Sequence, residues 1–111
     1  MNKGHFDRFF EHMIQEVKET RDCGQKEYAK DGNVFEDFHQ TSTLLGVSPF
    51  VTLYTFLNKH MRGIASWIKG HQSQREDVTG RIKDAIVYLF LLWAMIEEER
   101  MIDARTEDAS D

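Results

Sequence analysis

The feature that most constrains this chain is an unbroken apolar run of twelve residues, AIVYLFLLWAMI, at positions 85–96. A helix that spans a membrane needs about 20 apolar residues, so this run is too short to cross one. A surface helix carries only an apolar stripe, whereas a helix that is apolar on all sides must be covered on most of them. The run therefore predicts a buried helix at the centre of a helical domain.

Three other segments repeat apolar residues every three or four positions, which is the spacing of one helix face. Ser48 and Pro49 are typical of a helix start, because serine caps free backbone amides and proline fits the first turn. No segment shows the two-residue alternation of a strand. The sequence therefore predicts an all-α fold, a bundle of about four helices. The expected helices cover residues 4–22, 33–45, 49–69 and 76–100.

The length and composition of the chain fit one globular domain. Its 111 residues are 41% hydrophobic, which suffices for one core but leaves no room for a second. The last nine residues, DARTEDASD, are polar apart from two alanines and suggest no buried face. We therefore predict a single helical domain at 1–102 and a disordered acidic tail at 103–111.

Charge and cysteine content narrow the partners and the compartment. A net charge of -5 argues against nucleic acid as a partner, since binding its backbone requires a surplus of Lys and Arg. The single cysteine, Cys23, excludes an intrachain disulfide, and the first twenty residues lack the uniform apolar stretch of a secretory signal. These features predict a cytoplasmic protein that does not insert into membranes.

The helix expected at 49–69 carries a second apolar strip beside its main stripe, formed by Phe56, His60, Gly63 and Trp67. Glycine inside a helix costs about 1 kcal/mol relative to alanine, so Gly63 indicates the close approach of another backbone or side chain. One core face does not need so wide an apolar surface. The strip favours a homo-oligomer; the alternative is that the four helices simply wrap around these faces.

A polar strip interrupts the start of the most apolar helix. Arg81, Asp84 and Tyr88 fall within about 60° on a helical projection. A carboxylate entering an apolar helix must be paired, because burying it alone costs several kcal/mol. The three residues form either a local network that fixes the helix or one wall of a ligand site. In the second case Arg81 and Tyr88 face the ligand and Asp84 orients one of them.

Other charged residues allow chemistry without requiring it. Lys59 belongs to a basic face that is either solvated or a phosphate-binding patch, and His60 suits an interface or core position better than a catalytic one. Glu16 and Glu19 share a helix face, as two Mg²⁺ ligands do, and Asp84 is the candidate third ligand. However, a second acid is needed near Asp84, where Arg81 stands. We therefore expect no metal cofactor, and Glu16 and Glu19 suit a solvated face.

Four motifs occur in a recognisable order: EYAKDGNVFEDF, LLGVSP, FLNKHMRGI and REDVTGRIKDAIVYLFLL. In this order the chain resembles a group of small bacteriophage proteins, and it looks related to the nucleotide-modification-associated domain of the first type. The resemblance covers residues 24–97 and implies a link to nucleotides. The positions that it points to are Tyr28, Asn33, Phe35, Lys59, His60, Glu76, Arg81, Asp84 and Tyr88.

A looser likeness is to the MazG-like all-α nucleoside triphosphate pyrophosphohydrolases, through the helical architecture and a similar last helix. These enzymes carry paired Glu-x-x-Glu and Glu-x-x-Asp motifs. Here Arg81 replaces an acid of the second pair, which argues against hydrolysis.

Three functional hypotheses follow. The first, which we favour, is a phage protein that binds a nucleotide or nucleotide-derived signal and sequesters a host immune nucleotide. In it, Arg81 and Lys59 contact phosphate and Tyr28 or Phe35 stacks on a base. The second is a Mg²⁺-dependent nucleoside triphosphate pyrophosphohydrolase using Glu16, Glu19 and Asp84, with Glu76 as a further ligand. The third is a helical protein-interaction adaptor.

Overall fold

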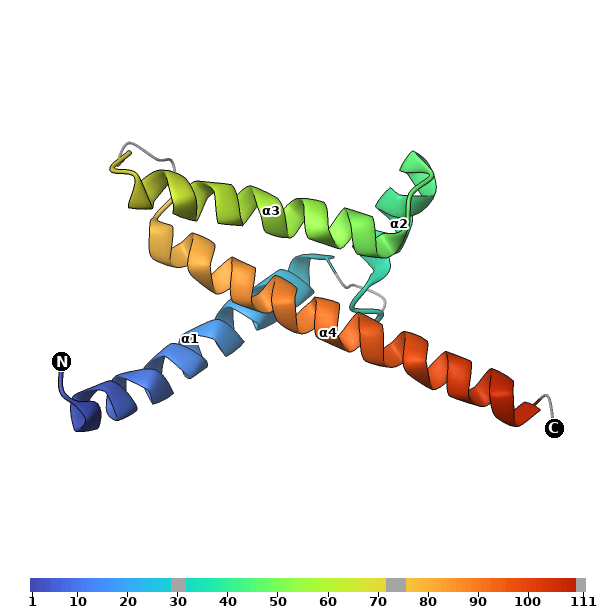
Figure 1. The fold of residues 1–111 in the computed structure, drawn as a ribbon, viewed down its shortest axis with the longest axis horizontal. Helices are drawn as coiled ribbons and strands as arrows, with labels where there is room; N and C mark the ends of the chain where they lie inside the picture. The colour runs from blue at the N-terminus through green and yellow to red at the C-terminus, as the bar shows by residue number, and fades with distance from the viewer. Residues whose placement is uncertain (29–31, 72–75, 110–111) are drawn as a thin grey trace.

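The computed structural model describes residues 1–28, 32–71 and 76–109, and the side chains in these ranges apart from those of 25–28 and 107–109. Within these ranges the chain forms four helices and no strand (Figure 1). The predicted all-α fold is confirmed. The helices are α1 (Lys3–Tyr28), α2 (Glu36–Leu45), α3 (Pro49–Ile68) and α4 (Val78–Ala109).

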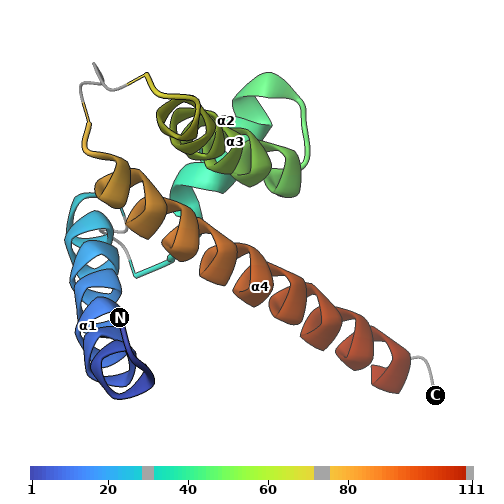
Figure 2. The same cartoon turned by 60° about the vertical axis from the view of Figure 1, so that its left-hand side comes forward.

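The other three helices gather at the first half of α4. Helix α3 runs back along α4, α1 crosses α4 on another side, and the short α2 packs against the start of α3 (Figures 1 and 2). The start of α1 and the end of α4 project away from the other helices (Figure 1). The molecule is therefore elongated, with extents of 56 × 35 × 26 Å.

The core lies where α2 and α3 meet α4. Leu53 on α3 is completely buried, and it packs with Phe38 of α2 and Met95 of α4. Phe35, which precedes α2, joins the same cluster at 4% exposure. Partly buried residues from the apolar run extend this core along α4. They are Tyr88, Leu91 and Leu92.

The start of α3 follows the sequence prediction. The Ser48 hydroxyl oxygen accepts a hydrogen bond from the Phe50 amide at 3.1 Å, and Pro49 occupies the first turn. Gly46 ends α2 in the left-handed conformation, with φ of 70°. Local chemistry therefore sets the α2–α3 junction, because each residue satisfies a backbone requirement of its own.

Two helix ends differ from the prediction. Helix α1 continues through Gly24 to Tyr28, and α4 continues to Ala109 instead of ending near Arg100. Residues 103–109 thus belong to α4 in the structure, where we predicted a disordered tail at 103–111; residues 110–111 lie outside the described residues. The composition of 103–109 lacks a buried face but also lacks proline and glycine, so nothing stops the helix. The Arg100 guanidinium contacts Glu97 at 2.9 Å across one turn, which supports the helix through the acidic stretch.

The apolar run on α4 keeps one exposed side, although α3 and α1 cover others. Leu89, Phe90 and Trp93 are 51%, 56% and 62% exposed, so the prediction of burial on most sides is wrong for the single chain. On α3, Tyr54, Met61 and Ile68 of the expected apolar stripe are also exposed. The reason is geometric: α2 has only ten residues and α1 leans away from α4 over its first half. Four helices therefore do not wrap around these faces.

Candidate functional site

A cleft of about 810 Å³ opens between α1 and the junction of α2, α3 and α4. Polar residues of α1 line one side of the cleft, and residues of α2, α3 and α4 line the remainder. The lining combines carboxylates, lysines and aromatic rings, which makes it the best candidate for a functional site. Its polar and aromatic residues include Glu16, Glu19, Asp37, Phe38, Phe56, Lys59, His60, Lys83, Asp84 and Tyr88.

Aromatic rings from three helices gather at one side of the cleft. The Tyr88 ring lies 6.3 Å from that of Phe56, nearly parallel to it, and 6.1 Å from that of Phe38, edge to face. The His60 ring stacks on Tyr88 with centroids 5.5 Å apart. Such contacts hold the rings in fixed orientations. The cleft thus has a rigid aromatic wall, of which Phe56 is 38% exposed.

Charged side chains line the remainder of the cleft. Glu16 and Glu19 come from α1, and Lys83 from α4 reaches Glu16 with 3.5 Å between Nζ and Oε2. Lys59 lies on α3 beside the aromatic wall. Opposite charges therefore meet across the cleft, and the two lysines place positive charge next to a surface suited to a flat ring.

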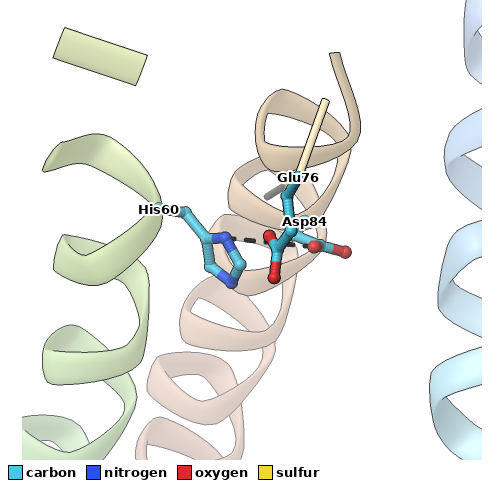
Figure 3. Close-up of side chains that lie close together, drawn as sticks. All are labelled: His60, Glu76 and Asp84. Carbon is cyan, nitrogen blue, oxygen red and sulfur yellow. Dashed lines mark ion pairs between the residues drawn. The ribbon is translucent and has the colours of Figure 1, made fainter. Parts of the chain in front are cut away.

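His60 and Asp84 face each other at the boundary of α3 and α4. His60 Nδ1 lies 3.9 Å from Asp84 Oδ2, too far for a hydrogen bond, and this buried nitrogen has no hydrogen-bond partner among the described residues. Glu76, just before α4, brings a carboxylate to the same place (Figure 3). One ligand atom from each residue lies within 4.8 Å of the other two.

Arg81 lies apart from the cleft, against Gly63 of α3. A β-carbon added to Gly63 would fall 2.6 Å from both Cδ and Cζ of Arg81 and would also contact Nη1. The close approach predicted at Gly63 is confirmed, and Arg81 is the group that makes it. The Arg81 Nε atom is buried without a hydrogen-bond partner among the described residues. This placement favours the structural interpretation of Arg81 over contact with a ligand in the cleft.

The candidate residues near α2 are separated from the cleft lining. Asn33 Oδ1 accepts a hydrogen bond from the Phe35 amide at 2.9 Å, which shapes the turn before α2. The Phe35 side chain belongs to the core, where it is unavailable for stacking on a base. Tyr28 is the last residue of α1, and its side chain lies outside the described residues. Of the nine positions that the resemblance points to, Lys59, His60, Asp84 and Tyr88 line the cleft.

Sequence reasoning missed Lys83, which lines the cleft together with Val87 and Leu91. These three residues repeat every four positions and lie next to Asp84 and Tyr88 on a helical projection. This spacing is the sequence signal for the cleft-facing side of the helix. The predicted polar strip is centred on Arg81, whereas the side of α4 that faces the cleft is centred closer to Lys83.

Comparisons with family models, curated proteins and solved structures find no match to this chain. The resemblance to phage nucleotide-associated proteins therefore stays a prediction. Over the described residues, no helix combines the length and the apolar content that crossing a membrane requires.

The contact between Gly63 and Arg81 makes a prediction about stability. Gly80 is a matched control, because it also lies in a helix but a β-carbon there would meet nothing within 4 Å. Gly80→Ala should stabilise the protein by about 0.5–1 kcal/mol. Gly63→Ala should be less favourable than this control by about 1–3 kcal/mol, because the methyl group displaces Arg81.

Urea denaturation of the two variants measures this difference. Combining Gly63→Ala with Arg81→Ala should remove most of the penalty, since the displaced group is gone. Equal stabilisation by both single substitutions would show that Arg81 does not pack against Gly63.

Proposed function

We propose that this protein binds a nucleotide or nucleotide-derived small molecule in the cleft between α1 and α3/α4. The observation that carries the proposal is the aromatic wall of Phe38, Phe56 and Tyr88 beside two lysines, Lys59 and Lys83. The cleft volume of about 810 Å³ falls in the range of small-molecule sites, about 300–1,000 Å³.

Each part of the ligand has a matching part of the cleft. A base stacks on the half-exposed Phe56, which Tyr88 supports from behind. Lys59 and Lys83 neutralise phosphate, for which lysine serves as a flexible point charge. The carboxylates of α1 accept hydrogen bonds from base or sugar. Arg81 has a structural role in this arrangement. Lys83 replaces it as the second residue, with Lys59, that contacts phosphate.

The resemblance to phage proteins supports a biological form of the proposal. A small phage protein that holds a host immune nucleotide in the host cytoplasm blocks signalling by stoichiometric binding alone. This function needs no catalytic group, and binding is therefore the simplest use of the cleft. The motifs in residues 24–97 are its only support.

A second candidate function is Mg²⁺-dependent hydrolysis of nucleoside triphosphates. The favouring observation is that Glu16 and Glu19 from α1 and Asp84 from α4 line the same cleft. Carboxylates from two helices are the donors that Mg²⁺ takes alongside substrate phosphates. Within the described residues, however, their oxygens do not converge as the ligand atoms of His60, Glu76 and Asp84 do. Binding without hydrolysis is thus the better-supported function.

Calorimetric titration followed by mass analysis of the ligand tests both candidates. The panel contains ribo- and deoxyribonucleoside triphosphates and cyclic dinucleotides, each with and without Mg²⁺. Saturable binding with an unchanged ligand mass supports the first candidate. Release of pyrophosphate that is lost in Asp84→Asn supports the second. Absence of binding and of hydrolysis across the panel contradicts the proposal and favours the adaptor hypothesis.

We further propose that the chain self-associates. A monomeric protein of 13.0 kDa exposes about 6,300 Å², whereas this chain exposes 8739 Å². The surplus of about 2,400 Å² per chain, or about 4,800 Å² for two chains, falls within the total burial in obligate homodimers, about 2,000–5,000 Å². Much of this surface is apolar, and a second copy carries the same apolar faces. The faces include Phe6, Phe9 and Phe10 on α1, Tyr54 and Met61 on α3, and Leu89, Phe90 and Trp93 on α4.

Self-association predicts a specific effect of charge on α4. The wild-type protein should sediment as a dimer or larger species in the analytical ultracentrifuge. Combining Leu89→Glu with Trp93→Glu should shift it to the monomer, because both side chains are more than half exposed in the single chain and bear on no core contact. Circular dichroism checks that the variant stays helical. A wild-type protein that is monomeric at all concentrations would disprove self-association.

A further inference from the structure

The side chain of His60 has a buried nitrogen, Nδ1, that makes no hydrogen bond within the described residues. The side chain is only 10% exposed. A buried polar atom without a partner costs about 1–3 kcal/mol. Stacking on Tyr88 fixes the plane of the ring, and the Nδ1 edge points at Asp84 (Figure 3). The nitrogen is therefore held toward a carboxylate that it does not reach.

Two carboxylates approach this nitrogen from one side. Asp84 Oδ2 lies 3.9 Å from Nδ1, and Glu76 brings its carboxylate within the same 4.8 Å group. Two negative charges at this separation repel each other, and a cation between them removes the repulsion. Among the described residues, this is the one group of three His, Cys, Asp or Glu side chains that converges so closely.

We propose that His60, Glu76 and Asp84 bind a divalent transition-metal ion, with Zn²⁺ as the reference case. Zinc bonds to nitrogen and carboxylate oxygen are about 2.0–2.2 Å long, which puts ligand atoms of a tetrahedral site about 3.4 Å apart. The ligand atoms, which lie within 4.8 Å of one another, must therefore move closer by up to about 1.4 Å. Glu76 is exposed and Asp84 is half-buried, so rotation of these two side chains supplies the movement while His60 stays fixed.

The donor set decides between classes of metal. Mg²⁺ prefers oxygen ligands in a strict octahedron, whereas an imidazole nitrogen suits Zn²⁺, Co²⁺, Ni²⁺ or Cu²⁺. Three protein ligands leave at least one coordination position open on a tetrahedral ion. Because His60 and Asp84 also line the cleft, that position is near the proposed ligand site. The metal would then hold a ligand's anionic group without help from Arg81.

This metal site stands independently of the proposed nucleotide site. The sites share His60 and Asp84, but metal binding is measured here without any nucleotide. Glu76 does not line the cleft. Glu19 does line it but does not belong to the group of His60, Glu76 and Asp84. Glu76→Gln and Glu19→Gln therefore separate the proposed transition-metal site from the Mg²⁺ arrangement of the second candidate function.

The experiment titrates untagged, metal-free protein with Co²⁺ and Zn²⁺. Co²⁺ binding is read from its visible absorption, which reports coordination geometry, and Zn²⁺ binding from its displacement of Co²⁺. We expect one ion per chain with an intense tetrahedral or five-coordinate spectrum. Glu76→Gln and Asp84→Asn should each raise the Kd by at least about tenfold, and Glu19→Gln should leave it unchanged. Glu98→Gln on the exposed side of α4 is the charge-matched control.

His60→Ala removes the nitrogen ligand but also a buried ring, so its folding is checked by circular dichroism. The conservative variant Glu76→Asp, at an exposed position, tests the site without disturbing the core. It should bind Co²⁺ more weakly than wild type but more tightly than Glu76→Gln. Absence of stoichiometric Co²⁺ or Zn²⁺ binding would overturn the proposal. Binding that is insensitive to Glu76→Gln and Asp84→Asn would overturn it as well.

Discussion

Replacing Leu53 with alanine is expected to lower the free energy of unfolding by about 3–5 kcal/mol. Leu53 is completely buried and stands at the centre of the cluster formed by α2, α3 and α4. The substitution removes three side-chain carbon atoms and leaves a cavity that these three helices cannot collapse into without moving the aromatic wall. Because domains of this size are stable by about 5–15 kcal/mol, the variant should be partly unfolded at elevated temperature.

Denaturant unfolding followed by circular dichroism measures the loss. Leu44→Ala is the matched control, because Leu44 lies on α2 but is 84% exposed. The control should change stability by less than about 0.5 kcal/mol. A loss below 1.5 kcal/mol for Leu53→Ala would mean that the α2, α3 and α4 cluster is not the main core.

Removing both lysines of the cleft is expected to abolish most of its affinity for a phosphate-bearing ligand. A hydrogen bond to a charged group contributes about 1.5–3 kcal/mol, so Lys59→Gln with Lys83→Gln should weaken binding by at least about 100-fold. The effect should be larger for nucleoside triphosphates than for nucleosides, since only the former carry the charge that the lysines neutralise. Calorimetric titration of both ligand types measures the difference.

The control for this variant changes the same charge elsewhere. Lys18→Gln with Lys69→Gln removes two exposed lysines that do not line the cleft and should leave affinity nearly unchanged. Lys83→Gln also breaks the contact with Glu16, but that half-exposed pair contributes at most about 1 kcal/mol. Equal loss of affinity in the two double variants would place the ligand outside the cleft, bound by diffuse charge alone.

The predicted parts of the fold depend on local chemistry. Ser48 starts α3 because its side chain caps a free backbone amide and Pro49 fits the first turn, and Gly46 ends α2 because it adopts positive φ at no steric cost. Gly24 has the same chemical freedom but no turn to make, and α1 runs through it. Residues 103–109 continue α4 because they contain no proline or glycine that would end a helix. The absence of a buried face, on which the predicted tail rests, does not by itself end a helix.

The cleft contains some of the residues that the sequence indicates as a site and not others. Lys59, His60, Asp84 and Tyr88 come together because they lie on the facing sides of α3 and α4. Arg81 lies against Gly63 instead. A helical projection gives the angles between residues of one helix, but it does not show which side of that helix faces a neighbouring helix. The contribution of Glu16 and Glu19 also depends on how α1 crosses α4, and that tertiary contact has no local signal.

The most direct test of the proposed function is an amide NMR titration of the ¹⁵N-labelled protein with the tightest-binding nucleotide of the panel. The proposal predicts that the largest shift changes fall on residues lining the cleft, above all Phe56, Lys59, Lys83 and Tyr88. The exposed face of α4 around Trp93 should be unaffected. Changes centred on that face, or no saturable change with any nucleotide, would contradict nucleotide binding in the cleft.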